Sequence, residues 1–211
     1  MNEPFAQDRD LLVLEPALLR DAGWAGQRVL NTTGSVAAST LTLASGSFAD
    51  AGIAAGSVLL IDALAIEVVT VQSPTTATVS LLRARRDGPP VPPPPATNRP
   101  VRAYSFAPQL ELVHRQVLAM AGIDPDGLGP LGQPAITNPS ALVRLEALGA
   151  LHLIYAGASA PGSGAALADR AAMYRERFAA ERGRVAVLVD LDADGIAEAR
   201  RSLSVIQLTR A

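Results

Sequence analysis

Apolar residues recur at helical spacing along one stretch near the C-terminal end of the chain. Leu167, Ala171, Tyr174 and Phe178 follow one another at intervals of four, three and four, so they lie on one stripe of a helix. Gly183 is expected to end this helix, because glycine readily takes the left-handed conformation of a helix C-cap. The pattern predicts a long amphipathic helix with one buried stripe.

The hydrophobic pattern changes from helical to extended after this helix. Residues 185–191 are apolar and rich in valine, residues 192–195 are typical of a turn, and residues 204–208 form a second apolar segment. These segments predict a C-terminal β-hairpin or arm over residues 184–211. An isolated two-stranded hairpin is only marginally stable in water, so we expect a β module or a neighbouring subunit to cover its apolar side.

Residues 28–86 show the pattern of a small β module. Strand-like segments, either alternating or continuously apolar, lie at residues 40–43, 58–61, 66–71 and 76–81, and glycines separate them. Short hairpins are unstable unless their faces are covered, so these segments favour a small closed barrel or a sandwich. The module is expected to fold by itself.

A proline-rich segment, DGPPVPPPPATNRP, follows the β module at residues 87–100. Polyproline is stiff and extended, and it lacks the backbone donors that a helix or a central strand needs. The segment is therefore expected to be a semi-rigid linker out of the β module. A ligand for an SH3-type domain is the less favoured alternative.

Two further helices and a short N-terminal helix complete the predicted elements. Helical patterns cover residues 109–122 and a stretch that opens at Pro139. The N-terminal segment, residues 1–27, ends with a short helix and with Trp24, which is expected to be a packing anchor. The chain is thus predicted to be an α+β protein, with a helical core of three main helices (residues 101–183) and an inserted small β-barrel or sandwich.

The amino-acid composition limits the cellular compartment expected for the chain and the kinds of functional site it can contain. The 211 residues are 49% hydrophobic and 18% charged, which suffices for one sizeable domain or two small ones. The absence of cysteine excludes disulfides, thiolate metal sites and cysteine nucleophiles. A net charge of −2 gives no global electrostatic footprint for nucleic acid. No apolar run reaches the length of a membrane helix and the N-terminus is acidic and polar, so a cytosolic origin is expected.

One acidic string resembles the start of a calcium-binding loop. Asp190, Asp192 and Asp194 occupy positions one, three and five, glycine occupies position six, and Glu198 occupies position nine. Position twelve, where a bidentate glutamate should close the site, is Arg201. A hairpin turn explains the same residues, because aspartate and glycine tolerate left-handed backbone. We therefore expect a turn without an essential metal or other cofactor.

No set of residues predicts catalysis. His152 lies on an apolar stripe and is expected to be a core histidine, while His114 is expected to be solvated. The chain has no nucleophile elbow, phosphate loop or glycine fingerprint, so an enzyme is not expected. Arg83, Arg85 and Arg86 form the densest basic cluster, which could contact a phosphate backbone or could simply be a solvated strand edge.

Three segments resemble a known family. They are RDLLVLEPALLRDAGWAGQ near the N-terminus, FADAGIAAGSVLLID followed by AIEVVTVQSPTTATVSL in the β module, and MYRERFAAERGRVAVLVDLDADGIAEARRS near the end. Together they resemble the head–tail connector (neck adaptor) proteins of tailed bacteriophages and gene transfer agents. Many of these adaptors are purely helical, so the β module and proline segment are expected to add a role such as contacting the capsid or holding fibres.

The resemblance implies a structural virion protein in the neck, at the portal vertex, made in the cytoplasm of a bacterial host. Copies would form a ring, expected to be twelve-fold, beneath the portal and around the DNA channel. The implied partners are the portal protein, neighbouring copies, the next neck or tail protein and, non-specifically, packaged DNA through Arg83, Arg85 and Arg86. The residues expected at the portal or subunit interface are Val185, Val187, Val189, Val205, Ile206 and Leu208.

A second hypothesis comes from another functional class. The acidic string and the β module together are consistent with a calcium-assisted surface- or carbohydrate-binding module of a phage tail. Its metal ligands would be Asp190, Asp192, Asp194 and Glu198. Calcium titration separates the two hypotheses.

Overall fold

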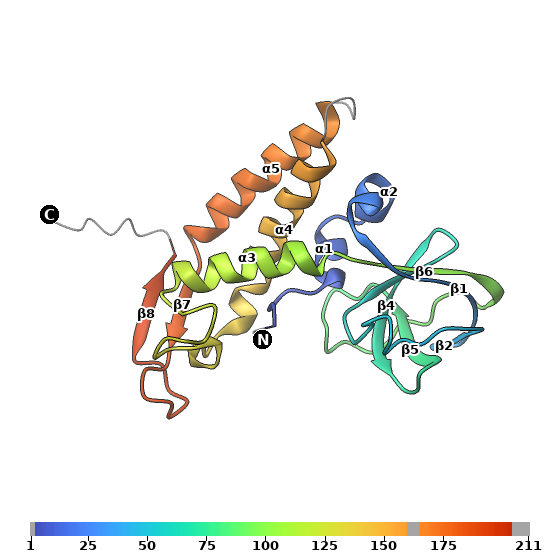
Figure 1. Ribbon diagram of the computed structural model, residues 1–211, viewed down its shortest axis with the longest axis horizontal. Coiled ribbons are helices and arrows are strands. Elements are labelled where there is room, and N and C mark those ends of the chain that lie inside the picture. The colour runs from blue at the N-terminus through green and yellow to red at the C-terminus, as the bar shows by residue number, and fades with distance from the viewer. Residues whose placement is uncertain (1–2, 160–164, 204–211) are drawn as a thin grey trace, which may run out of the picture. The chain divides into compact units, whose positions relative to one another are not determined.

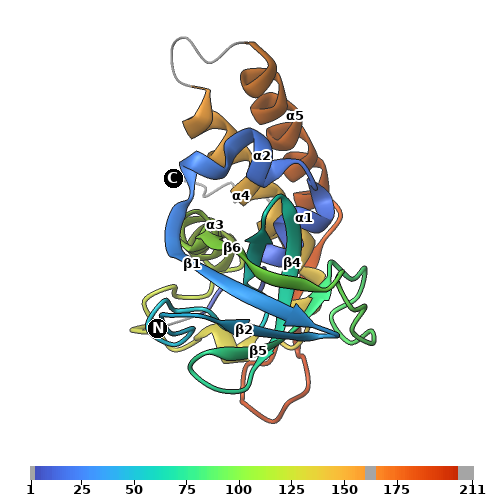
Figure 2. The same ribbon diagram turned by 90° about the vertical axis from the view of Figure 1, so that its right-hand side faces the viewer.

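The computed structural model describes residues 3–159 and 165–203, and the chain divides into two compact units (Figures 1 and 2). The barrel unit is Gln7–Ala107, and the helical unit is Pro108–Ala211 together with Met1–Ala6. The helices are α1 (Asp8–Leu14), α2 (Leu18–Ala22), α3 (Ala107–Met120), α4 (Val143–Ala158) and α5 (Ala165–Arg182), with 3-10 turns η1 (Gly23–Ala25), η2 (Gln133–Ala135) and η3 (Pro139–Ala141). The strands are β1 (Gln27–Ala37), β2 (Thr40–Leu43), β3 (Val58–Ile61), β4 (Leu64–Val71), β5 (Thr76–Leu81), β6 (Ala96–Ser105), β7 (Ala186–Val189) and β8 (Ala199–Ser202).

Six antiparallel strands close the barrel in the order β1-β2-β5-β4-β3-β6 (Figure 2). The four strand segments expected within residues 40–81 are confirmed as β2, β3, β4 and β5. Closure removes the exposed edges that an open sheet would present. The interior is filled by aliphatic side chains and one phenylalanine, among them Leu41, Phe48, Leu59, Ile66, Val79 and Val101.

The long strand β1 joins the two sides of the barrel, since it pairs with both β2 and β6. Its register to β6 shifts between Gly34 and Val36, which marks a bulge. Gly34 is required at this bend, because an added Cβ atom would lie 2.9 Å from the carbonyl oxygen of Thr42 and 3.0 Å from Val101 Cγ2. The bulge lets one strand curve from one wall of the barrel to the next.

The proline-rich segment does not leave the barrel. Val91 pairs with the end of β5: its carbonyl oxygen accepts the N–H of Leu81 (2.9 Å), and its own N–H donates to Ser80 Oγ (2.8 Å). The chain then enters β6, which pairs with both β1 and β3. Residues 87–100 are therefore part of the barrel unit, and the expected module of residues 28–86 lacks one strand.

Proline in β6 hid this strand from pattern analysis. Pro100 interrupts the alternation that marks a strand and has no backbone donor. It still accepts a hydrogen bond through its carbonyl oxygen, from the N–H of Asp62 at 3.1 Å. The strand therefore forms with one missing donor, which the closed barrel tolerates.

The N-terminal helices belong to the barrel unit. The short helix α2 lies where expected and buries Leu18 and Ala22. Trp24 follows it in η1 with 63% of its surface exposed, so the prediction of a packing anchor is wrong. Phe106 is the fully buried aromatic residue in this region, and it lies so close to Gly26 that a Cβ atom there would be 2.9 Å from the ring.

The helical unit is built on α4, which is buried along most of its length. The predicted stripe of α5 faces it: Ala171 and Tyr174 are buried, and Tyr174 stacks on Tyr155 of α4 with ring centroids 5.7 Å apart. Gly149 permits the close approach of three helices, because a Cβ atom there would lie 2.7 Å from Val113 Cγ1 and 3.1 Å from the Phe178 ring. Figure 1 shows α4 and α5 side by side.

The predicted arrangement, a helical core of three main helices with a small inserted β module, is wrong. The described residues contain five α helices and a closed six-stranded barrel, and the barrel unit takes up 101 positions, Gln7–Ala107. The barrel is thus a full half of the molecule, with its own two helices. The prediction failed because α1 is short, and because the sixth strand was hidden in a proline-rich segment.

The predicted C-terminal hairpin exists, but its second strand is different. β7 pairs antiparallel with β8, whereas the expected strand at residues 204–208 lies outside the described residues. The cover for β7 comes from the helical unit itself: Thr137 N–H donates to the Leu188 carbonyl oxygen (3.0 Å), and Asp190 N–H donates to that of Ala135 (2.8 Å). Neither the barrel nor a second subunit is needed to bury this strand.

One stretch, Pro139–Ala158, is long and apolar enough to cross a membrane by length and composition, contrary to expectation. Sixty-one per cent of its most apolar window is buried inside the protein. Its hydropathy is that of the core helix α4, which needs apolar residues around most of its circumference.

Candidate functional site

The loop between β7 and β8 brings four acidic side chains together. Carboxylate oxygens of Asp190, Asp192, Asp194 and Glu198 all lie within 4.8 Å of one another. Asp190 is buried and the other three are exposed. The residues predicted from the calcium-like string therefore share one place, and hard oxygen ligands of this kind suit a calcium ion.

The same carboxylates also hold the loop through backbone hydrogen bonds. Asp190 accepts the N–H groups of Ala193 and Gly195, both at 2.7 Å, and Asp194 accepts that of Ile196 at 2.7 Å. Burial acts to raise the pKa of Asp190, but these backbone donors outweigh it and hold the pKa below its usual value. Ala193 and Gly195 take positive φ angles of 66° and 88°, as expected for a tight turn.

Arg201, at the position of the missing glutamate, serves a different purpose. Its Nη1 atom donates to the carbonyl oxygens of Ala121 (2.7 Å) and Gly122 (3.0 Å), at the C-terminal end of α3. A cation at this end satisfies carbonyl groups that have no partner within the helix. Arg201 therefore ties β8 to α3 and leaves the acidic loop without its twelfth-position ligand.

The residues predicted at a portal or subunit interface differ in how far they are buried, and some lie outside the described residues. Val187 and Val189 are fully buried in the helical unit, so in this conformation they are closed to a partner. Val185 is half-buried. The remaining three, Val205, Ile206 and Leu208, lie outside the described residues.

A groove lies between the end of α3 and β8. It measures about 600 Å³ and is lined by Ala119–Gly122 at the end of α3 and by Arg200–Ser202 of β8. Among the described strands β8 pairs only with β7, so no described strand adds to its other edge. Unpaired strand edges are sites where a further extended segment can add.

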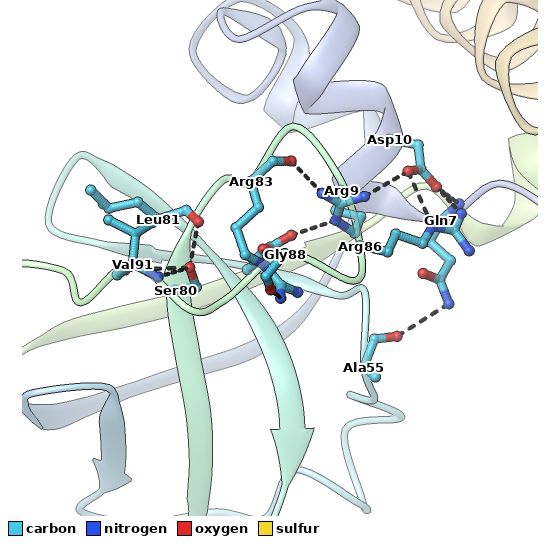
Figure 3. Close-up of polar contacts among 11 residues, drawn as sticks. Gln7, Arg9, Asp10, Ala55, Ser80, Leu81, Arg83, Arg86, Gly88 and Val91 are labelled. Atoms are coloured by element: carbon cyan, nitrogen blue, oxygen red, sulfur yellow. Dashed lines mark hydrogen bonds and ion pairs between the residues drawn. The ribbon is translucent and has the colours of Figure 1, made fainter.

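The barrel unit contains a network of buried charges that pattern analysis missed (Figure 3). Arg9 contacts both Asp10 and Glu67, and Arg83 makes a second ion pair with Glu67. Arg86 pairs with the other oxygen of Asp10. Figure 3 shows Arg9 between Asp10 and Arg83, whose carbonyl oxygen accepts from Arg9. The network joins α1 to β4 and to the segment after β5.

The basic cluster predicted for DNA is thereby divided. Arg83 is held inside the network and is almost fully buried, so it cannot meet a phosphate in this conformation. Arg86 is partly exposed, while Arg85 is exposed and pairs with Asp87 at 2.9 Å. The hydrogen bonds that Arg85 donates to Asp87 lower the pKa of the Asp87 carboxyl and raise the pKa of Arg85. Only two of the three arginines remain candidates for a DNA contact.

The two histidines have exchanged their predicted environments. His114 is buried, and its Nδ1 atom donates to Glu146 Oε1 at 2.6 Å. His152, expected in the core, is half-buried and its Nδ1 atom lies 3.0 Å from the Ala171 carbonyl oxygen. The other oxygen of Glu146 accepts the backbone N–H of Ala6 at 2.9 Å, and the ring of Phe5 packs edge-on against His114. The pair anchors the N-terminal segment in the helical unit.

No family model, curated protein or solved structure matches the chain. The geometry must therefore carry any functional assignment. In the described residues, neither histidine has a hydroxyl nucleophile among its hydrogen-bond partners. Two features of the described residues that could act on a partner, the acidic loop and the groove beside β8, lie at the C-terminal sheet.

Proposed function

We propose that this chain is a head–tail adaptor of a tailed bacteriophage or gene transfer agent. It is a structural virion protein that forms a ring beneath the portal and joins capsid to tail around the DNA channel. The three segments that resemble neck adaptors support this proposal. The structural observation that carries it is the two-stranded sheet of β7 and β8, whose β8 has no described strand on its other side and lines a groove. The apolar residues Val205, Ile206 and Leu208 follow it in the sequence.

The sheet edge at β8 and the apolar residues that follow it supply the two parts of strand addition. Backbone groups of β8 give affinity to an extended partner segment, and apolar side chains give the contact its specificity. The portal, or the next copy in the ring, is the partner of this end of the chain.

A second surface suits contacts between copies in a ring. α5 has 18 residues, of which only Ala171 and Tyr174 are buried. Its remaining faces carry arginine and glutamate, and polar faces of this kind suit the rim of a subunit interface. Contact with packaged DNA would be non-specific, through Arg85 and Arg86.

The proposal is tested with a chain that ends at Leu203, which keeps every described element. We expect the shortened protein to retain the circular dichroism spectrum and the unfolding midpoint of the full chain. It should lose binding to purified rings of the portal protein that the same genome encodes. Replacing Val205 and Ile206 with aspartate in the full chain should have the same effect, and Thr209→Ala is the matched control. Electron microscopy of the mixtures reports ring decoration. If the full chain fails to decorate portals, the adaptor function is wrong; if the shortened chain decorates them normally, only the role of the C-terminal end is wrong.

A second candidate function, a calcium-assisted surface- or carbohydrate-binding module of a phage tail, rests on the four carboxylates within 4.8 Å. Calorimetric titration with calcium tests it, with Asp192→Ala as the comparison. A micromolar site that the substitution weakens would favour this function. The absence of binding at millimolar calcium would exclude it.

A further inference from the structure

A small cavity opens in the barrel unit beside the start of α1. Its volume is about 200 Å³. Its lining residues are partly aliphatic, and those with polar groups are Asp8, Gln27, Ser57, Tyr104 and Ser105. Typical pockets for drug-sized ligands have volumes of roughly 300–1,000 Å³, so this cavity admits only a small molecule or a single side chain.

Asp8 is the one carboxylate in the wall of this cavity, and only 8% of its surface is exposed. Its Oδ1 atom accepts the backbone N–H of Phe106 at 2.9 Å, which fixes the carboxyl group in place. Burial raises the pKa of Asp8 to about 6, against the hydrogen bonds from Phe106 and Ser105 that lower it. The group is still largely ionised at neutral pH.

The neighbouring acids of the barrel unit are neutralised, and Asp8 is not. Asp10 pairs with Arg9 and Arg86, and Glu67 pairs with Arg9 and Arg83. Among the described residues no basic side chain lies within ion-pair distance of Asp8. A buried carboxylate without a counter-ion is strongly unfavourable, and it favours any cation that can enter the space beside it.

We propose that this cavity binds a small organic cation, an alkylammonium or guanidinium group, with Asp8 as its counter-ion. The aliphatic wall receives the carbon stem, and Ser57, Ser105 and Gln27 offer further acceptors to the N–H groups of the head. The cation comes either from a free amine or from a lysine or arginine side chain of another protein. The inference is independent of the adaptor function.

The test is a titration of the full ¹⁵N-labelled chain with n-butylammonium at pH 7.5, followed by amide chemical shifts. We expect saturable shifts at the residues of the cavity wall, such as Ala51, Ile53 and Ala103, and none with n-butanol, which has the same stem without the charge. Asp8→Asn keeps an acceptor for the Phe106 N–H and should weaken binding at least ten-fold. Asp50→Asn, on the exposed surface next to Ala51, should change it less than two-fold.

A second variant protects the test against loss of the fold in Asp8→Asn. Ala51→Leu fills the cavity and leaves the carboxylate in place, and it should also abolish the saturable shifts. Blocked arginine, with both ends capped as amides, separates the sources: binding equal to or tighter than butylammonium identifies a protein side chain, and weaker binding identifies a free amine. The proposal is overturned if butylammonium gives no saturable shifts up to 100 millimolar, roughly the limit of useful affinity. It is also overturned if butanol matches butylammonium, or if either cavity variant binds like the wild type.

Discussion

His114 of α3 and Glu146 of α4 meet inside the helical unit, with 2.6 Å between Nδ1 and Oε1 and with both side chains buried. Glu146 also receives the backbone N–H of Ala6 through its second oxygen. One carboxylate therefore joins two helices and the N-terminal segment.

Glu146→Gln should destabilise the helical unit by about 3 kcal/mol, because the amide accepts at only one of its two positions and leaves a buried donor without a partner. Urea unfolding followed by circular dichroism measures the change. Glu111→Gln, at an exposed position of α3, is the control and should change the unfolding free energy by less than about 0.5 kcal/mol. Equal losses in the two variants would contradict the role of the buried carboxylate.

Glu67→Gln should destabilise the barrel unit by about 3 kcal/mol, since two arginine side chains, Arg9 and Arg83, lose their shared buried counter-ion. Denaturant unfolding detects the loss. Arg85→Ala removes an exposed ion pair of the same region, and its unfolding midpoint should stay close to that of the wild type. A midpoint for Glu67→Gln that also stays unchanged would show that the network adds no stability.

Asp8 should make the barrel unit less stable as the pH rises. Its pKa is raised from 3.8 to about 6, so the folded state holds the proton more tightly than the unfolded state. Its stabilising contribution is complete below pH 4, is lost as the pH rises toward 6, and stays lost above that. The loss is at most about 3 kcal/mol. Unfolding free energies of wild type and Asp8→Asn at pH 4, 5, 6 and 7 should diverge in favour of the variant; a constant difference across this range would refute the shift.

The fragment 7–107 should fold by itself, and the fragment 28–86 should not. The shorter fragment lacks β6, which pairs with both β1 and β3, and without it the barrel is open on one side. Circular dichroism and thermal melting distinguish a cooperative strand spectrum from an unfolded one. A cooperative melt of the shorter fragment would mean that the five strands β1 to β5 are enough.

Local pattern identified elements that carry their own periodicity. Short turns join β3 to β4 and β4 to β5, β2 alternates although it pairs with β5 more than 30 residues on, and α5 shows its buried stripe in its own spacing. β6 was missed because its strand character comes from β1 and β3, to which it returns after the proline segment. The residues of β6 include Pro100 and show no regular alternation, so a local window does not reveal these distant partners.

The candidate sites also differ in whether their residues lie close together in the sequence. The acidic loop was found because its four carboxylates lie within nine residues of one another. The pair of Arg9 and Glu67 spans 58 positions, and no periodicity links them. His114 could have been placed correctly, since it lies four residues after Leu110 and on the same buried face of α3. The prediction that His114 is exposed rested on its charged neighbours in the sequence, Glu111 and Arg115.

The hydrogen bond between Ala6 and Glu146 makes the order of assembly differ from the order of synthesis, since the two residues are 140 positions apart. At about 5–20 residues per second, the N-terminal segment leaves the ribosome roughly ten seconds before its acceptor exists. The barrel unit, encoded between them, can close during that wait. The N-terminal segment is therefore made before the barrel unit but docks only after Glu146 has been made, and a substitution at Phe5 would act on that late step.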